Sequence, residues 1–153
     1  MEKYDLIIVG AGPAGIFTAV ELLRHGSKKK ILLVEKGKPV EKRHCPKAEL
    51  GHCVNCRPTC AITTGFSGAG AFSDGKYNLT NEFGGTLYEY IGKQKAMELM
   101  HYVDDINVAC GGAGTKLYST ADSGFKRLCL QNNLHLLDAS VRHLGTDINY
   151  KVL

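Results

Sequence analysis

The sequence predicts an α/β fold that opens with a strand, a helix and a second strand. Three observations support this prediction. The segment 4–9 contains four consecutive apolar residues, 6–9, which are typical of a buried parallel strand. A second apolar run, 31–34, ends at the acidic residue Glu35. Between the two runs, apolar residues recur at helical spacing on one face, at Ile16, Ala19, Val20 and Leu23.

The first strand leads directly into a glycine turn of the pattern G-x-G-x-x-G. Gly10 permits a tight turn, Gly12 leaves room for a pyrophosphate, and Gly15 lets the following helix pack closely on the sheet. The helix is expected to begin around Pro13 and Ala14, so that its unpaired N–H groups face the phosphates. This pattern predicts a dinucleotide-binding turn.

Glu35 follows Gly15 by 20 residues and ends the second strand. A carboxylate at that place accepts hydrogen bonds from ribose hydroxyls and repels a 2′-phosphate. Strand, glycines, helix, strand and acid together predict a Rossmann-like unit within residues 1–36. The alternative is a glycine-rich turn in another kind of α/β unit.

The rest of the chain divides by composition into an irregular segment at 37–77, rich in cysteine and glycine, and a helical and mixed segment at 78–153. Within the latter, Phe125, Leu128 and Cys129 are expected to face inward. The expected elements are a helix at 86–109 interrupted near Gly92, a strand at 115–119, a helix at 121–132 and a strand at 134–139.

Residues 141–147 are polar and turn-like. Arg142, His143 and Asp147 lie together there and are candidate site residues. The alternative is the start of a helix, with Thr146 or Asp147 as its cap. The sequence does not separate the two interpretations.

A second glycine-rich stretch occupies residues 65–75. Its glycines permit positive φ and close approach of the backbone to a ligand, and successive N–H groups in such a loop bind anions. Ala69, Ala71 and Phe72 make it more apolar than a plain surface linker. We therefore expect a loop that faces a cofactor.

Four of the six cysteines, Cys45, Cys53, Cys56 and Cys60, lie close together in the sequence. One C-x-x-C pair with two flanking thiols is compatible with zinc or an iron–sulfur cluster. A redox disulfide between Cys53 and Cys56, or thiols without a special role, are the alternatives.

Composition excludes several classes of function. The net charge of +4 is small, and Lys28, Lys29 and Lys30 form the only tight basic run, so nucleic-acid binding is not expected. No apolar run reaches the length of a membrane span, and no basic leader frames residues 6–20 as a signal peptide. We expect a cytoplasmic protein.

The motifs taken together resemble known flavoproteins. The string from Tyr4 to Gly15, with Glu35-Lys36-Gly37, is similar to the start of a glutathione-reductase-type FAD domain. The more specific strings are Cys53–Cys56, Gly65–Lys76 and Arg142–Asp147. With them, the chain resembles the bacterial family usually called uncharacterised FAD-dependent dehydrogenases, or NAD(P)- and FAD-dependent oxidoreductases.

This resemblance implies an oxidoreductase that binds FAD and that takes NAD(P)H as a candidate electron donor. It does not identify catalytic residues. The residues that match the family are Gly10, Gly12, Pro13, Ala14 and Gly15 at the pyrophosphate, Glu35 and Lys36 at the ribose, and Gly68, Ala69, Gly70, Ala71, Phe72, Ser73, Asp74 and Gly75 beside the flavin.

Members of this family are much longer than the present chain, which lacks their closing FAD segment. We therefore expect an incomplete doubly wound domain, the N-terminal part of a larger protein. Its partners would be an unidentified small-molecule substrate and either the missing C-terminal part or a partner chain. An NAD-dependent dehydrogenase and a non-catalytic nucleotide- or metal-binding module remain alternatives.

Overall fold

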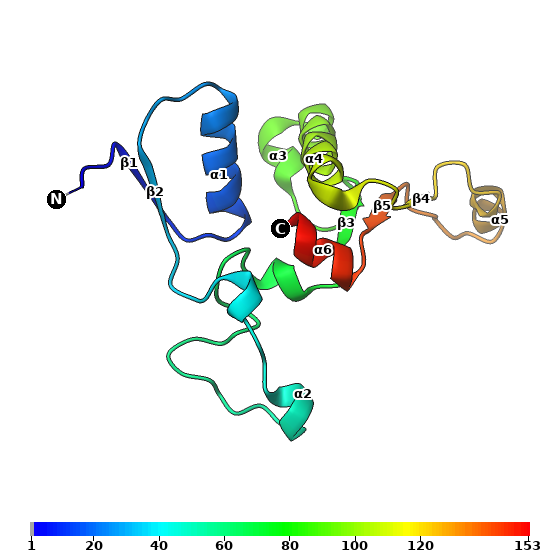
Figure 1. Ribbon diagram of the computed structural model, residues 1–153. Coiled ribbons are helices and arrows are strands. Elements are labelled where there is room, and N and C mark those ends of the chain that lie inside the picture. Colours follow the sequence, from blue (N-terminus) through cyan, green and yellow to red (C-terminus); the bar gives the residue numbers. More distant parts are fainter. Residues whose placement is uncertain (1) are drawn as a thin grey trace. The chain divides into compact units, whose positions relative to one another are not determined.

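The computed structural model describes residues 2–153, which form two compact units of mixed α/β structure, 2–72 and 73–153 (Figure 1). Each unit has its own small sheet. The first sheet is parallel and the second is antiparallel. No helix among residues 2–153 combines the length and the apolar character needed to cross a membrane.

The first unit begins with β1 (Leu6–Val9), α1 (Pro13–Arg24) and β2 (Ile31–Val34). The two strands pair in parallel, with Leu6 opposite Ile31 and Val9 opposite Val34. The pairing continues into the glycine turn, where the Gly10 N–H donates to the Val34 carbonyl at 2.7 Å. The predicted order of strand, helix and parallel strand is therefore present (Figure 1).

The expected burial of the first strand is wrong. Only Ile8 of β1 is buried, whereas Ile7 is 58% exposed and Val9 is 84% exposed. Strands of parallel sheets become buried when the sheet has neighbouring strands and layers on both faces. Here the sheet has two strands, and α1 is the helix that packs on them.

Residues 35–72 are mostly irregular, as predicted. They contain three short helical elements: η1 (Val40–Lys42), α2 (Lys47–Leu50) and η2 (Ala69–Phe72). Figure 1 shows α2 and the loop around it extending away from β1, β2 and α1 of the same unit. The chain between α2 and η2 returns to the glycine turn, as the contacts below show.

The second unit is built on the sheet order β3–β5–β4, in which both pairings are antiparallel. Its strands are β3 (Lys76–Leu79), β4 (Leu117–Ser119) and β5 (Ser140–His143). Its helical elements are α3 (Leu87–Ile91), α4 (Lys93–Asn107), η3 (Val108–Gly112), α5 (Phe125–Gln131) and α6 (Thr146–Val152).

Two predictions for this unit are confirmed. The helix expected at 86–109 is present as α3 and α4, which are separated at Gly92. Gly92 has a φ of +83°, a conformation that interrupts a helix. A short strand lies within 115–119 as β4.

The strand predicted at 134–139 is wrong, because the strand lies at 140–143 instead. Backbone groups of Leu137 and Ala139 pair with Thr120, and the Asp138 carbonyl between them accepts from the Thr80 hydroxyl. The Thr120 hydroxyl donates to the Leu137 carbonyl at 2.7 Å, and the Ala139 N–H donates to that hydroxyl at 2.9 Å. Alternating apolar residues alone could not reveal this side-chain competitor.

The inward face predicted for the helix at 121–132 is also wrong. The helix present, α5, is shorter, and its Phe125 and Leu128 are 69% and 54% exposed. Cys129 is half-buried. Figure 1 shows α5 in the long connection between β4 and β5, away from the sheet of its own unit, so its apolar side chains have little of that sheet to cover.

Of the two interpretations left open for residues 141–147, the alternative of a helix start is the one present, as α6, but its cap differs from the residues considered. Gly145, with a φ of +76°, precedes the first turn, and neither Thr146 nor Asp147 is the cap. Arg142 and His143 lie on β5, and Asp147 lies in the first turn of α6. The three candidates therefore do not share one turn.

Candidate functional site

The first candidate site is the glycine turn between β1 and α1. Gly12 is the N-cap of α1, Pro13 stands in its first turn, and no side chain of the described residues caps this end. The first N–H groups of a helix have no partner inside the helix, and the dipole makes this end positive. The turn therefore offers backbone donors and positive potential to an anion.

Each glycine of the turn meets a different steric demand. Gly10 has a φ of +99°. A Cβ at Gly15 would overlap the Gly10 carbonyl oxygen, so the helix can pass this close to the strand only without a side chain. A Cβ at Gly12 would meet no protein atom within 4 Å. Gly12 thus leaves open space at the helix N-terminus.

Glu35 lies against the same turn. Its carboxylate accepts hydrogen bonds from the N–H groups of Ala11 and Gly37, each at 2.8 Å. These bonds, led by the one from Ala11, lower the pKa of the Glu35 carboxyl below its ordinary value. A carboxylate has about four lone-pair positions, so Glu35 can hold the turn and still accept a hydrogen bond from a ligand hydroxyl.

The glycine-rich loop folds back onto this turn. The Ser67 N–H donates to the Ala11 carbonyl at 2.8 Å. A Cβ at Gly68 would lie 3.3 Å from Cδ of Pro13 and 3.4 Å from Cα of Gly12. Two motifs more than 50 residues apart in sequence are therefore neighbours in the first unit.

Arg43 holds the loop in place, a role that no local sequence pattern indicates. Its buried guanidinium donates four hydrogen bonds of 2.6–2.8 Å and stacks on the Phe72 ring, with 4.7 Å between the guanidinium carbon and the ring centre. Desolvation lowers its pKa, while the charge of Glu35 acts in the opposite direction. The carbonyl acceptors are those of Ala61, Ile62, Phe66 and Gly68.

The predicted loop residues after Phe72 belong to the second unit and make contacts there. Asp74 pairs with Lys76 at 2.7 Å. The Ser73 hydroxyl accepts from the Gly75 N–H and contacts the buried Asn149 side chain at 3.3 Å. Of the predicted loop, Gly68, Ala69, Gly70, Ala71 and Phe72 therefore lie in the first unit, with Ser73, Asp74 and Gly75 in the second.

The remaining predicted residues are placed as follows. Pro13 and Ala14 form the first turn of α1, as expected. Lys36 is exposed on the chain just after β2. Arg142 has a structural role, because its guanidinium pairs with the buried Asp104 through two hydrogen bonds of 2.6 and 2.8 Å.

The four clustered cysteines line one cavity of about 320 Å³ in the first unit. All four thiols are free. Hydrogen bonds from Thr63 and Ile62 lower the pKa of the Cys60 thiol. Across residues 2–153, no three His, Cys, Asp or Glu side chains are placed to hold a single metal ion. The fold therefore brings the four cysteines of the predicted cluster to one cavity; they are Cys45, Cys53, Cys56 and Cys60.

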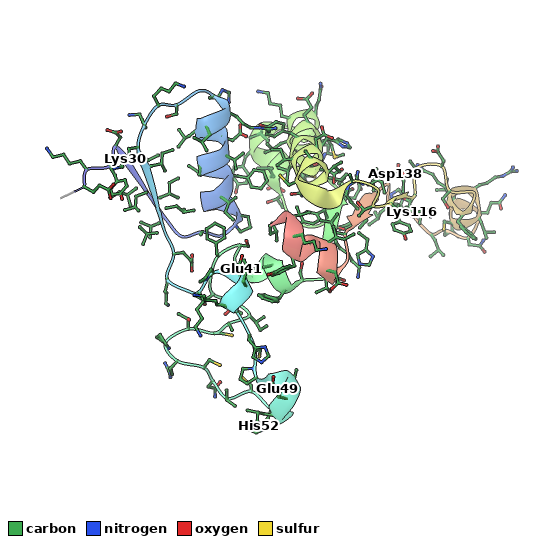
Figure 2. All side chains as sticks on the ribbon, viewed as in Figure 1. Lys30, Glu41, Glu49, His52, Lys116 and Asp138 are labelled. Carbon is green, nitrogen blue, oxygen red and sulfur yellow. The ribbon has the colours of Figure 1, made fainter. Side chains whose placement is uncertain are left out.

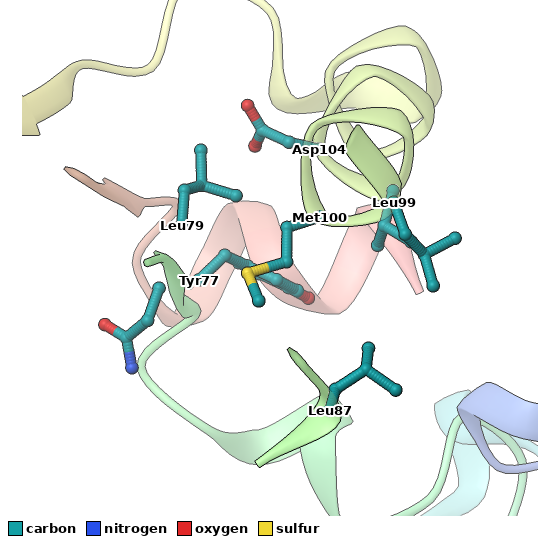
Figure 3. A pocket seen from close by; sticks show the side chains of 8 residues that line it. Tyr77, Leu79, Leu87, Leu99, Met100 and Asp104 are labelled. Carbon is teal, nitrogen blue, oxygen red and sulfur yellow. The ribbon is translucent and has the colours of Figure 1, made fainter. Parts of the chain in front are cut away.

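A cavity of about 230 Å³ in the second unit is mostly apolar (Figure 3). The carboxylate at its wall, Asp104, is already paired with Arg142. The cavity therefore offers shape and apolar surface but no free charged group of its own. Side chains that line it and are labelled in Figure 3 are Tyr77, Leu79, Leu87, Leu99, Met100 and Asp104.

Comparisons with known proteins find two partial similarities. A 70-residue stretch is 40% identical to an uncharacterized protein of Clostridium beijerinckii and covers 46% of this chain and 13% of that protein. A 37-residue stretch is 51% identical to the "Putative FAD-dependent oxidoreductase LodB" of Marinomonas mediterranea and covers 24% of this chain and 10% of that protein. No family model and no solved structure matches.

Proposed function

We propose that residues 2–72 form a Rossmann-like unit that binds the ADP portion of FAD, as part of an FAD-dependent oxidoreductase. The observation that carries this proposal is the meeting of the two glycine motifs beside Glu35. The partial similarity to the "Putative FAD-dependent oxidoreductase LodB" of Marinomonas mediterranea supports the choice of FAD. The chain spans 13% or less of the length of the two relatives. The oxidoreductase activity of the whole protein is therefore part of this proposal.

The pyrophosphate would lie at the N-terminus of α1. Gly12 leaves open space there, and no described side chain competes for the N–H groups of the first turn. Backbone donors and the helix dipole favour a negatively charged group at such an end. Gly10 and Gly15 shape the turn, while Pro13 and Ala14 set the direction of the first helical N–H groups.

The ribose of the ADP portion would bind Glu35. Its carboxylate is fixed by the Ala11 and Gly37 N–H groups, so it needs no rearrangement to accept a ribose hydroxyl. Its negative charge disfavours a 2′-phosphate. Lys36 is the exposed neighbour that can approach the same end of the nucleotide.

The loop at 65–72 would cover the nucleotide and lead toward the flavin. Arg43 fixes its backbone, and Ser67 ties it to the turn. When bound, FAD supplies hydride transfer, and the residues here position it. The small-molecule substrate, an NAD(P)H donor, a partner chain and the compartment remain predictions.

A pair of matched variants tests the nucleotide site. Gly12 and Gly124 both have open space at Cβ and negative φ, −79° and −58°. Gly12→Val would put a side chain where the pyrophosphate is proposed to bind, whereas Gly124→Val alters a turn of the second unit. We expect Gly12→Val to weaken FAD and ADP-ribose binding at least about tenfold, or about 1.4 kcal/mol, and Gly124→Val to leave it unchanged.

Isothermal titration with FAD, ADP-ribose, NAD⁺ and NADP⁺ gives the readout. Equal FAD affinity in the unaltered chain and Gly12→Val would contradict the assignment, and so would the absence of FAD and ADP-ribose binding in the unaltered chain. NAD⁺ binding without FAD binding would contradict the FAD proposal and support the alternative of an NAD-dependent dehydrogenase. Circular dichroism confirms that both variants fold.

A further inference from the structure

Residues 44–64 form a segment without a hydrophobic core. None of these residues is buried, and α2, a single helical turn at Lys47–Leu50, is the regular element within them. The labelled side chains Glu49 and His52 mark this segment in Figure 2. Small structures that cannot bury enough apolar surface gain order from disulfides or bound metal. We therefore expect a covalent or metal cross-link, rather than an apolar core, to order this segment.

The segment carries the means for such a cross-link. Four cysteines from three places along it line one cavity of about 320 Å³. All four are free thiols and are therefore available as ligands. The other two cysteines of the chain, Cys110 and Cys129, belong to the second unit and do not line this cavity.

We propose that Cys45, Cys53, Cys56 and Cys60 hold a four-iron iron–sulfur cluster through their thiolates. A single zinc ion requires four sulfur atoms about 2.3 Å from one point. The described residues contain no group arranged to hold a single ion, yet all four thiols border the same space. A [4Fe–4S] cluster is a larger body that takes its thiolates farther apart, so it matches this arrangement better.

The surroundings of the cavity suit an anionic centre. Four thiolates on a [4Fe–4S]²⁺ core give a net charge of −2. Lys47 and Arg57 also line the cavity, and its lining includes no carboxylate. The Cys60 sulfur lies within hydrogen-bonding reach of the Ile62 and Thr63 N–H groups, and such bonds to cluster sulfurs are a usual means of stabilising and tuning these centres.

Cluster binding does not depend on the proposed FAD site, because its ligands are four side chains that FAD binding does not use. The core assembles without a further oxidant or reductant from two Fe²⁺, two Fe³⁺ and four sulfide ions, whose charges sum to +2, while four thiols release four protons. Its loss or retention can therefore be measured on FAD-free protein.

The test is anaerobic reconstitution of the full FAD-free chain with ferrous iron, ferric iron and sulfide. We expect about four irons and four acid-labile sulfides per chain, together with slower proteolysis within 44–64. Each of Cys45→Ser, Cys53→Ser, Cys56→Ser and Cys60→Ser should lower the iron and sulfide content. The matched controls Cys110→Ser and Cys129→Ser should keep it.

Stoichiometry of the unaltered chain decides the proposal even where a serine variant fails to fold. Zinc at one ion per chain without sulfide would overturn the cluster in favour of a mononuclear site. Four alkylatable thiols after reconstitution, or intramolecular disulfides detected by mass spectrometry, would overturn metal binding. Iron content that is equal in the four serine variants and the two controls would place the cluster elsewhere.

Discussion

The Glu35 carboxylate holds the glycine turn through the N–H groups of Ala11 and Gly37. Glutamine can accept from one N–H, but its amide nitrogen would face the other donor. At pH 7 we expect Glu35→Gln to lower the free energy of unfolding by about 1–3 kcal/mol. This free energy is measured by urea unfolding, with the NMR resonances of β1 and β2 as the probe. The exposed Glu98→Gln serves as the control and should change little.

The pKa of Glu35 gives that effect a pH dependence. Its folded pKa lies below the ordinary value because the Ala11 and Gly37 N–H groups stabilise the charged form. The stability that it contributes is therefore present above the unfolded pKa and is lost as the pH falls through the folded pKa. We expect the difference between the unaltered chain and Glu35→Gln to shrink in acid. A constant difference down to pH 3 would contradict this account.

Arg43 organises the loop at 61–68 through four carbonyl groups. Arg43→Ala would leave several of these carbonyls without a donor, each a loss of about 1–3 kcal/mol where water cannot replace it. We expect faster hydrogen exchange at the Ser67 and Gly68 amides, whose partners lie in this loop and the turn. The exposed Arg127→Ala is the control. Unchanged exchange in Arg43→Ala would refute this role.

At the scale of elements, the contact between β1 and α1 depends on Gly15. A Cβ there would overlap the Gly10 carbonyl oxygen and approach Cγ2 of Ile8 at 3.3 Å. We expect Gly15→Ala to destabilise the first unit by about 1–3 kcal/mol. Gly12→Ala, with open space at Cβ, should change its stability by less than about 0.5 kcal/mol. Denaturant midpoints that are equal in the two variants would show that the close packing is absent.

Elements that depend on local sequence were predictable. The turn, α1 and β2 were found because glycine positions, helical spacing and a short apolar run are local signals. Gly92 likewise separates α3 from α4. Each of these signals needs no knowledge of distant residues.

Elements that depend on distant partners were not predictable. The strand β5 is polar and pairs with both β3 and β4, and its neighbours fix it rather than its own pattern. In the predicted strand at 134–139, the Leu137 carbonyl and the Ala139 N–H bond to the Thr120 hydroxyl instead. For the same reason, no local pattern marked Arg43 or the buried Asn149, since their partners are backbone groups and side chains far along the chain.

At the scale of the molecule, the parallel sheet exposes an apolar surface. Ile7 and Val9 are largely exposed, and Val34 is 43% exposed. Exposed apolar strand surface favours association between chains. We expect the double variant Ile7→Thr and Val9→Thr to raise the solubility of the protein, with little change in its free energy of unfolding. The buried Ile8→Thr should instead destabilise the unit by about 1–3 kcal/mol. Light scattering and urea unfolding separate the two effects.

The candidate site was predictable in its parts but not in its assembly. Gly10–Gly15, Glu35 and the loop glycines stand out as motifs in the sequence. Their meeting depends on the Ser67–Ala11 hydrogen bond and on Arg43, which carry no sequence signature. The grouping of the four cysteines around one cavity likewise requires the irregular chain between them to fold back.

The most direct test of the FAD proposal is an NMR titration of the isotope-labelled chain with FAD. The proposal predicts that the amides of Gly12, Ala14 and Gly15 shift first, together with those of Ser67 and Gly68, and that ADP-ribose reproduces the shifts at the turn. Shifts confined to the apolar cavity around Leu79 and Met100, or no shifts at millimolar FAD, would contradict it.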